Sequence, residues 1–157
     1  MTTDVAAELR ARQQITDLIY DYCRLLDAMD LISLAELFTD ECVVDYGPGP
    51  GFQSAGAAQL RQDLARMWRW TRTSHHSSNV QITFTSSETA RATSYVLAWH
   101  ERPDGTAATM MGQYHDELVR QSAVWRIARR RQLLTGNDQG FNVDINRFER
   151  MPDLRAR

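Results

Sequence analysis

Two kinds of side chain that transfer protons near neutral pH stand out in this sequence. Asp27 lies near the end of a regularly spaced apolar stretch, and His75 and His76 open a later strand-like segment. An unperturbed imidazole titrates near pH 6.5, and a buried carboxylate bound to one ring nitrogen raises the basicity of the other. Asp27 paired with one of these histidines would be a general base, although an aspartate at a helix end is more often a cap.

Tyrosine hydroxyls could complete such a site. A phenol such as that of Tyr22 or Tyr46, in the same apolar pocket, can polarise a carbonyl or assist a departing hydroxyl group. The alternative for Tyr22 is a core aromatic, since Leu18 and Leu26 lie at helical spacing from it. A base together with a phenol suits elimination without a cofactor.

Further candidates lie along the chain. Of the two histidines on later strands, His100 and His115, we favour His115 for substrate binding, because Tyr114 precedes it and is a binding candidate itself. Tryptophans at positions 68, 70 and 99 fit a core, and one of them, for which we select Trp68, could form a pocket wall for a ring-shaped ligand.

Several classes of chemistry are disfavoured. The sequence has no phosphate-binding loop, no dinucleotide glycine fingerprint, no nucleophile elbow and no histidine cluster at metal-ligand spacing. We therefore expect no metal, no cofactor, and neither phosphoryl nor hydride transfer.

Charge and composition point to a small-molecule ligand. A net charge of -2 gives no broad basic field for nucleic acid, and the arginines at 129–131 would alternate between strand faces, where acids such as Glu117 can pair with them. No apolar run has the length of a membrane span or a signal peptide. Cys23 and Cys42 fit reduced core positions, so we expect a cytoplasmic protein that contacts neither nucleic acid nor membrane.

The hydrophobic pattern predicts an α+β protein. Apolar spacing indicates helices over 5–29, 31–38 and 60–70, with Asp30 capping the second, and a short strand over 42–46. Four long strands follow, at about 75–85, 89–102, 107–120 and 125–134. Such segregation favours a largely antiparallel curved sheet wrapped over three helices around a pocket. We predict one domain over 1–135 and a tail over 136–157 that docks on it or on a neighbouring subunit.

Several motifs resemble those of a known family. They include Tyr22 with Asp27 five residues later, Val44-Asp45-Tyr46-Gly47, Thr73-x-His75-x-x-x-Asn79, and the strand motifs 92–97, 112–118 and 125–128. Together they resemble SnoaL-like proteins, which belong to the nuclear-transport-factor-two-like cone folds, and the resemblance covers roughly residues 8–135. Among its enzymes, the pattern is most similar to scytalone dehydratase and the bile acid 7α-dehydratase.

The resemblance implies a role for each matched residue. Asp27 and His75 would form the base pair, Tyr22 would be the catalytic tyrosine, and Asn79 would belong to the substrate site. Strand alternation, however, places His76 rather than His75 on the apolar face, so His76 is held in reserve. A bulge just after His75 would resolve the conflict by turning His75 inward.

The sequence therefore predicts a cofactor-independent lyase, a dehydratase, acting on a mostly apolar hydroxylated carbonyl compound of the polyketide, steroid or terpenoid kind. Isomerisation and polyketide cyclisation begin with the same proton removal and remain open. A non-catalytic cone-fold subunit, like the small subunits of ring-hydroxylating dioxygenases, is the alternative of another class, and a pocket filled by side chains would favour it. The family resemblance also implies a homotrimer or homodimer.

Overall fold

The computed structural model describes residues 5–151, which form three α-helices, one 3-10 helix and six strands. In chain order the elements are α1 (Val5–Asp27), α2 (Leu31–Ala35), β1 (Phe38–Asp45), β2 (Gln53–Ala55), α3 (Ala57–Leu64), η1 (Ala65–Arg69), β3 (Arg72–Phe84), β4 (Thr89–Glu101), β5 (Ala107–Gln121) and β6 (Val124–Asn137). The helices come first and the long strands afterwards, as the hydrophobic pattern predicts.

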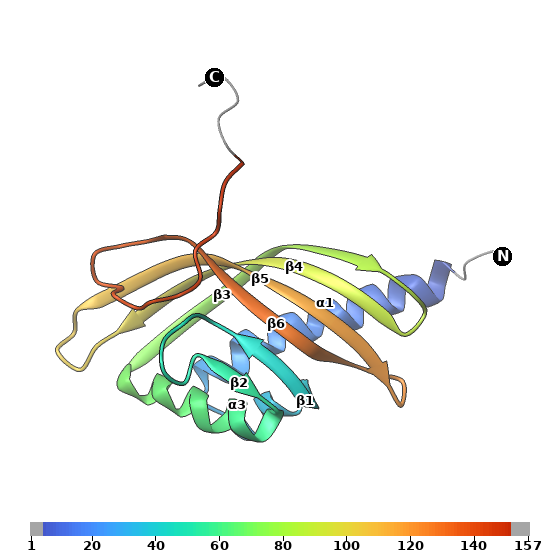
Figure 1. Ribbon diagram of the computed structural model, residues 1–157, viewed down its shortest axis with the longest axis horizontal. Coiled ribbons are helices and arrows are strands. Elements are labelled where there is room, and N and C mark those ends of the chain that lie inside the picture. The colour runs from blue at the N-terminus through green and yellow to red at the C-terminus, as the bar shows by residue number, and fades with distance from the viewer. Residues whose placement is uncertain (1–4, 152–157) are drawn as a thin grey trace.

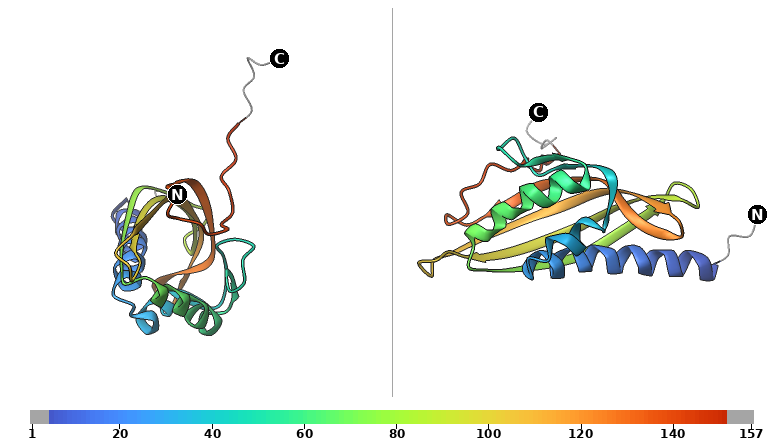
Figure 2. Two further views of the ribbon diagram at one scale, coloured as in Figure 1. Left: turned by 90° about the vertical axis from the view of Figure 1, so that its left-hand side faces the viewer. Right: turned by 90° about the horizontal axis from the view of Figure 1, so that it is seen from below.

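The six strands form one mixed sheet in the order β2-β1-β6-β5-β4-β3. Neighbouring strands are antiparallel except β1 and β6, which are parallel. The long strands curve, and α1 and α3 lie along the hollow side of the sheet (Figures 1 and 2). This arrangement confirms the predicted α+β architecture with a curved sheet wrapped over the N-terminal helices.

Helix α1 packs one apolar face into the sheet. Its buried residues include Ile15, Ile19, Tyr22 and Leu26, which recur at spacings of three and four. The next helix, α2, begins as predicted: the backbone N–H of Ser33 donates to the Asp30 carboxylate at 3.1 Å. Within residues 5–151, no helix combines the length and the apolar character that crossing a membrane requires.

Two differences from the predicted elements have local causes. Strand β1 starts at Phe38, four residues before the predicted start. The apolar pattern does not reveal these residues, because Asp40 and Glu41 are exposed and interrupt it where the register with β6 is irregular. Strand β2, which was not predicted, has only three residues and is too short to show a period of two.

The third predicted helix is two helices in the structure. The chain changes at Ala65 from the α-helical geometry of α3 to the 3-10 geometry of η1. A 3-10 helix repeats every three residues, so after Leu64 the inward positions are Met67 and Trp70 rather than Trp68.

The segment after β6 folds back over the hollow side of the same domain (Figure 1). Phe141 and Ile145 are buried, and the backbone N–H of Leu134 donates to the carbonyl of Asn146. Gly47 lies so close to this segment that a Cβ there would be 2.5 Å from the Asp144 carbonyl oxygen. The segment therefore forms part of the wall of the interior.

Candidate active site

The carboxylate of Asp27, the last residue of α1, meets the ring of His75 on β3. His75 Nδ1 lies 2.6 Å from Asp27 Oδ1, and the His75 backbone N–H donates to Oδ2 at 2.8 Å. The hydroxyl of Thr73 also donates to Oδ1 at 2.7 Å. The His75 side chain is 5% exposed and the Asp27 side chain 26%, so the imidazole is buried while the carboxylate keeps partial access to solvent.

A bulge in β3 explains why His75 faces inward. The register with β4 shifts between Ser78 and Gln81, and Asn79 within the bulge has a φ of 51°. Before the bulge Thr73 and His75 face inward, whereas after it Val80 takes the inward position. One extra residue thus reconciles the strand alternation with an inward-facing His75.

Hydrogen bonds fix the ionisation state of Asp27. Burial favours the neutral acid, but donors from the His75 ring and backbone and from Thr73 outweigh it and lower the pKa of Asp27. An ionised carboxylate only accepts hydrogen bonds, so Nδ1 of His75 is the donor. Nε2 of neutral His75 then carries a lone pair, which is the proton-accepting end of the pair.

His100 on β4 lies beside this pair. Its ring meets the ring of His75 edge to face, with centroids 5.4 Å apart, and its Nδ1 donates to the carbonyl of Ala108 at 3.2 Å. Burial and the proximity of His75 lower the pKa of His100 to about 4. His100 is therefore neutral at neutral pH and packed inside the protein. From the sequence, His115 rather than His100 is the favoured candidate.

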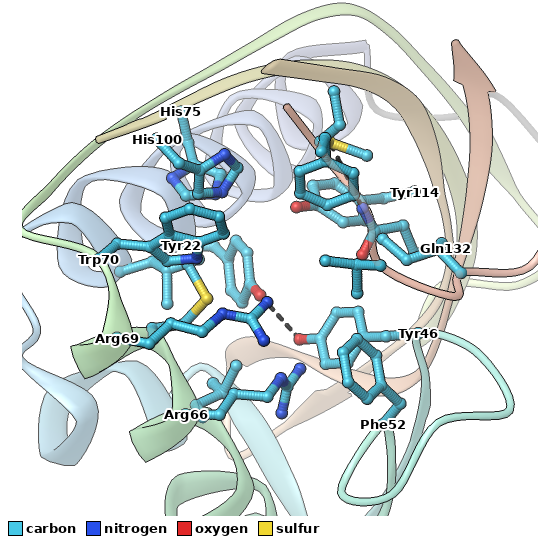
Figure 3. A pocket seen from close by; sticks show the side chains of 17 residues that line it. Tyr22, Tyr46, Phe52, Arg66, Arg69, Trp70, His75, His100, Tyr114 and Gln132 are labelled. Carbon is cyan, nitrogen blue, oxygen red and sulfur yellow. Dashed lines mark hydrogen bonds between the residues drawn. The ribbon is translucent and has the colours of Figure 1, made fainter. Parts of the chain in front are cut away.

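Three tyrosines gather further along the cavity. The hydroxyl oxygens of Tyr22 and Tyr46 are 2.7 Å apart, and the Tyr22 ring meets the Tyr114 ring edge to face (Figure 3). Burial raises the pKa of Tyr22, and the positive charge of Arg130 and the hydrogen bond with Tyr46 partly offset this increase. Burial raises the pKa of Tyr46 well above its usual value. Either hydroxyl can donate in this hydrogen bond, and the one that accepts keeps its own proton for another acceptor.

A buried ion pair packs against the rings of Tyr22 and Tyr114. The Arg130 guanidinium binds both carboxylate oxygens of Asp116 at 2.8 Å, and both side chains are fully buried. Its central carbon lies 4.1 Å from the Tyr22 ring centroid and 4.2 Å from that of Tyr114. The neighbours Arg129 and Arg131 point outward, as strand alternation predicts, and Arg129 lies 4.0 Å from Glu117.

The inward-facing groups enclose a cavity of about 50 Å³. Its lining is shown in Figure 3 and combines Tyr22, Tyr46, Tyr114, His75, His100, Trp70, Gln132, Arg66, Arg69, the apolar side chains of Leu26, Phe52, Leu64, Met67 and Met110, and Phe141, Val143 and Ile145 of the C-terminal segment. The cavity thus brings together Tyr22, Tyr46, His75 and Tyr114 of the predicted site, and Asp27 stands directly behind His75.

Four candidates lie elsewhere. Trp68 is 68% exposed, because the 3-10 turn gives its expected place to Trp70. Asn79 is exposed at the bulge, where its left-handed backbone explains the residue type. His115 faces the outer side of the sheet and bonds Gln113 at 2.9 Å, and His76 is exposed beside Ser74. The binding roles expected for Trp68, Asn79 and His115 are therefore not supported by their positions.

Sequence reasoning missed the arginines at the cavity. Arg66 and Arg69 belong to the stretch that was assigned to a single amphipathic helix, where exposed arginines are unremarkable. Among residues 5–151 there is no group of three or more His, Cys, Asp or Glu side chains placed to hold a metal ion. The chemistry available from the described side chains is proton transfer, hydrogen bonding and anion binding.

Solved structures share this arrangement of helices and sheet. The protein described as "Putative Scytalone Dehydratase" from Novosphingobium aromaticivorans is 29% identical, with a TM-score of 0.87 over 94% of this chain and 99% of that one. A hexachlorocyclohexane dehydrochlorinase (LinA), type 2, is 18% identical, with a TM-score of 0.76 over 94% and 97% of the two chains. An NTF2-like protein from N. aromaticivorans is 23% identical, with a TM-score of 0.69 over 85% and 90%.

These likenesses define the chain as an NTF2-like α+β protein with a cavity inside its curved sheet. The SnoaL-like domain family matches residues 7–131, and the chain belongs to that family. Structural relatives in this group include proteins named as a dehydratase and as a dehydrochlorinase. No curated protein matches the sequence significantly.

Proposed function

We propose that this protein is a cofactor-independent lyase that removes water from a hydroxylated carbonyl compound, with the Asp27–His75 pair as its base. The observation that carries the proposal is the 2.6 Å contact of Nδ1 with the Asp27 carboxylate beside the cavity. With Nδ1 occupied, Nε2 of His75 is left to accept a proton. The dehydratase name of the 29% identical structure supports the same reaction class.

The reaction begins with proton transfer. Nε2 of His75 takes the proton from the carbon next to the substrate carbonyl, and the C–H electron pair moves to form an enolate. The Asp27 carboxylate stabilises the resulting imidazolium, and the Tyr22 hydroxyl donates a hydrogen bond to the enolate oxygen. Arg130, 4.1 Å from the Tyr22 ring, adds a positive charge near the phenol without contacting substrate.

The second step expels water. The enolate electron pair forms the new carbon–carbon double bond while the bond to the β-hydroxyl group breaks. The proton on Nε2 passes to the departing oxygen, so the products are an unsaturated carbonyl compound, water and His75 in its starting state. Isomerisation or cyclisation would share the first step and differ in where the enolate electrons go next.

The size of the cavity bears on the non-catalytic alternative. About 50 Å³ is far below the roughly 300–1,000 Å³ of ordinary small-molecule sites, which favours a subunit without a substrate. A surface hollow of about 300 Å³, however, adjoins the cavity and shares Arg69, Trp70 and Val143 with it. We propose that substrate enters here, displacing the Arg69 side chain and the segment around Val143 so that the two spaces join.

The test combines two readouts on one set of compounds. Scytalone and a series of cyclic β-hydroxy ketones are incubated with the protein in D2O; ultraviolet absorbance follows the enone, and NMR follows deuterium at the α-carbon. We expect Asp27→Asn and His75→Gln to lower both rates by about 10²- to 10⁴-fold. His76→Gln is the matched control and should retain the wild-type rates, because His76 is exposed beside Ser74.

Each outcome separates the candidates. Deuterium exchange without loss of water would assign the proton transfer to an isomerase or a cyclase. Ketones that bind without exchanging their α-protons would contradict the proposed base and support a non-catalytic subunit.

A further inference from the structure

Two arginines line the same cavity as the base, and a third lies just outside it. Arg66 and Arg69 line the cavity, and Arg69 and Arg102 line the adjoining hollow. Figure 3 shows the Arg66 and Arg69 side chains extending toward the tyrosine pair. The route from the surface to His75 is thus bordered by three guanidinium groups.

Within the described part of the chain, these guanidinium groups form no salt bridge. Among residues 5–151, none of Arg66, Arg69 and Arg102 forms a salt bridge, whereas six other arginines do. No aspartate or glutamate occurs among the described residues that line the cavity. Burial, followed by repulsion from Arg66 and Arg102, lowers the pKa of Arg69. Asp104 lies near enough to Arg102 for the guanidinium to help lower the pKa of that carboxyl, but within residues 5–151 no salt bridge compensates the charges of Arg66 and Arg69.

Aromatic rings hold the guanidinium groups in place. Arg66 lies 4.4 Å from the Phe52 ring centroid, and its Nη1 donates to the carbonyls of Gly51 and Asp63. The guanidinium carbon of Arg69 lies 5.0 Å from the centroid of the Trp70 ring. Within residues 5–151, the Arg69 guanidinium donates no hydrogen bond. A stacked guanidinium still presents N–H donors at its edge, in a geometry that fits carboxylate or phosphate oxygens.

We infer that Arg69, assisted by Arg66, binds an anionic group of the ligand, a carboxylate or a phosphate, while the rest of the ligand enters the cavity. The inference rests on the proposed function for the position of the reacting carbon, and it changes the expected substrate class. A mostly apolar neutral compound would leave the arginines desolvated and unpaired. The substrate is instead a hydroxylated carbonyl compound that carries a negative charge at the end facing the surface.

The experiment compares charged and neutral probes of one shape. Binding of 2-naphthoate, 2-naphthamide and 2-naphthyl phosphate to the full-length protein is measured by isothermal titration calorimetry. A hydrogen bond to a charged group is stronger than one to a neutral group, so one of the anions should bind at least about tenfold more tightly than the amide. Which anion binds more tightly distinguishes a carboxylate from a phosphate ligand.

Variants locate the anion. Arg69→Gln should reduce the preference for anion over amide to about threefold or less, and Arg69→Lys should retain part of it. Arg61→Gln is the control, because Arg61 is exposed on α3 and borders neither the cavity nor the hollow. His75→Gln should keep the full preference, so a failure of the proposed chemistry would leave this result unchanged.

Three results would overturn the inference. They are the absence of detectable binding by either anion, equal binding of anion and amide by the wild type, and an equal preference in Arg69→Gln and Arg61→Gln.

Discussion

His75 and Asp27 are 48 positions apart in the chain, yet two hydrogen bonds join them, one from the ring at 2.6 Å and one from the backbone at 2.8 Å. The backbone bond occupies Oδ2, so the carboxylate cannot rotate away from the ring without losing both partners. The end of α1 and the start of β3 are thereby held in the geometry that a base needs.

Thr73 completes the binding of the carboxylate. Thr73→Val keeps the β-branched shape but removes the hydroxyl that donates to Asp27 at 2.7 Å. We expect proton transfer, measured as α-deuterium exchange, to slow by about tenfold, because one hydrogen bond to a charged group is lost. Thr83→Val, at an exposed position of the same strand, should keep the wild-type rate. Equal rates in the two variants would show that the hydroxyl has no positioning role.

His100 should make stability depend on pH. Its pKa is about 4 in the folded protein, against 6.5 in an unperturbed side chain, so between these values the unfolded state binds a proton that the folded state does not. The free energy of unfolding therefore falls as the pH drops from about 6.5 to about 4, by up to about 3 kcal/mol from this group. Above pH 6.5 the contribution is constant.

Urea denaturation across this pH range isolates the effect. His100→Asn keeps a donor for the Ala108 carbonyl but does not titrate, so its stability should fall less than that of the wild type as the pH drops. His115→Gln, on the outer face of the sheet, should follow the wild type. Parallel curves for the wild type and His100→Asn would contradict the assignment of His100 as a buried neutral histidine.

The Asp116–Arg130 pair should be a strong determinant of folding. Asp116→Asn removes the charge that the fully buried guanidinium pairs with, and breaking a buried pair costs about 3–5 kcal/mol. Glu117→Gln removes a neighbouring acid that is exposed and 4.0 Å from Arg129, and should change stability by less than about 0.5 kcal/mol. Similar losses of unfolding free energy in both variants, measured by urea denaturation, would mean that the buried pair contributes no more to stability than the exposed one.

Much of this structure could be predicted from local sequence. Apolar spacing gave α1 and the four long strands, Asp30 was correctly predicted as a cap, and the conflict over His75 correctly implied a bulge in β3. These features depend on residues that are near one another in the chain, so their periods and cap residues are visible without coordinates.

Other features of the site depend on three-dimensional geometry that the spacing of apolar residues does not reveal. The change to a 3-10 turn moved the inward position from Trp68 to Trp70, and the pairing of Arg130 with Asp116 required the register between β5 and β6. His115 was preferred over His100 because Tyr114 is its neighbour. Adjacent strand residues face opposite sides of a sheet, however, so this adjacency places His115 outside.

The outer face of the sheet should form the contact between subunits of a homo-oligomer. Tyr95, Leu97 and Met111 are each more than 40% exposed there, and Leu97 lies opposite Met111 in neighbouring strands. We expect Leu97→Glu combined with Met111→Glu to reduce the oligomer to a monomer in analytical ultracentrifugation. Ile32→Glu, on α2, is the control for an exposed apolar residue elsewhere. A monomeric wild type would contradict the expectation.

The tautomer of His75 tests the central claim most directly. Long-range ¹⁵N–¹H NMR at neutral pH, with the His75 signals assigned by their loss in His75→Gln, reports which ring nitrogen carries the proton. If Asp27 holds the ring for proton abstraction, Nδ1 is protonated and Nε2 is not, and Asp27→Asn changes the His75 signals. A proton on Nε2 in the wild type, or His75 signals that Asp27→Asn leaves unchanged, would contradict the account.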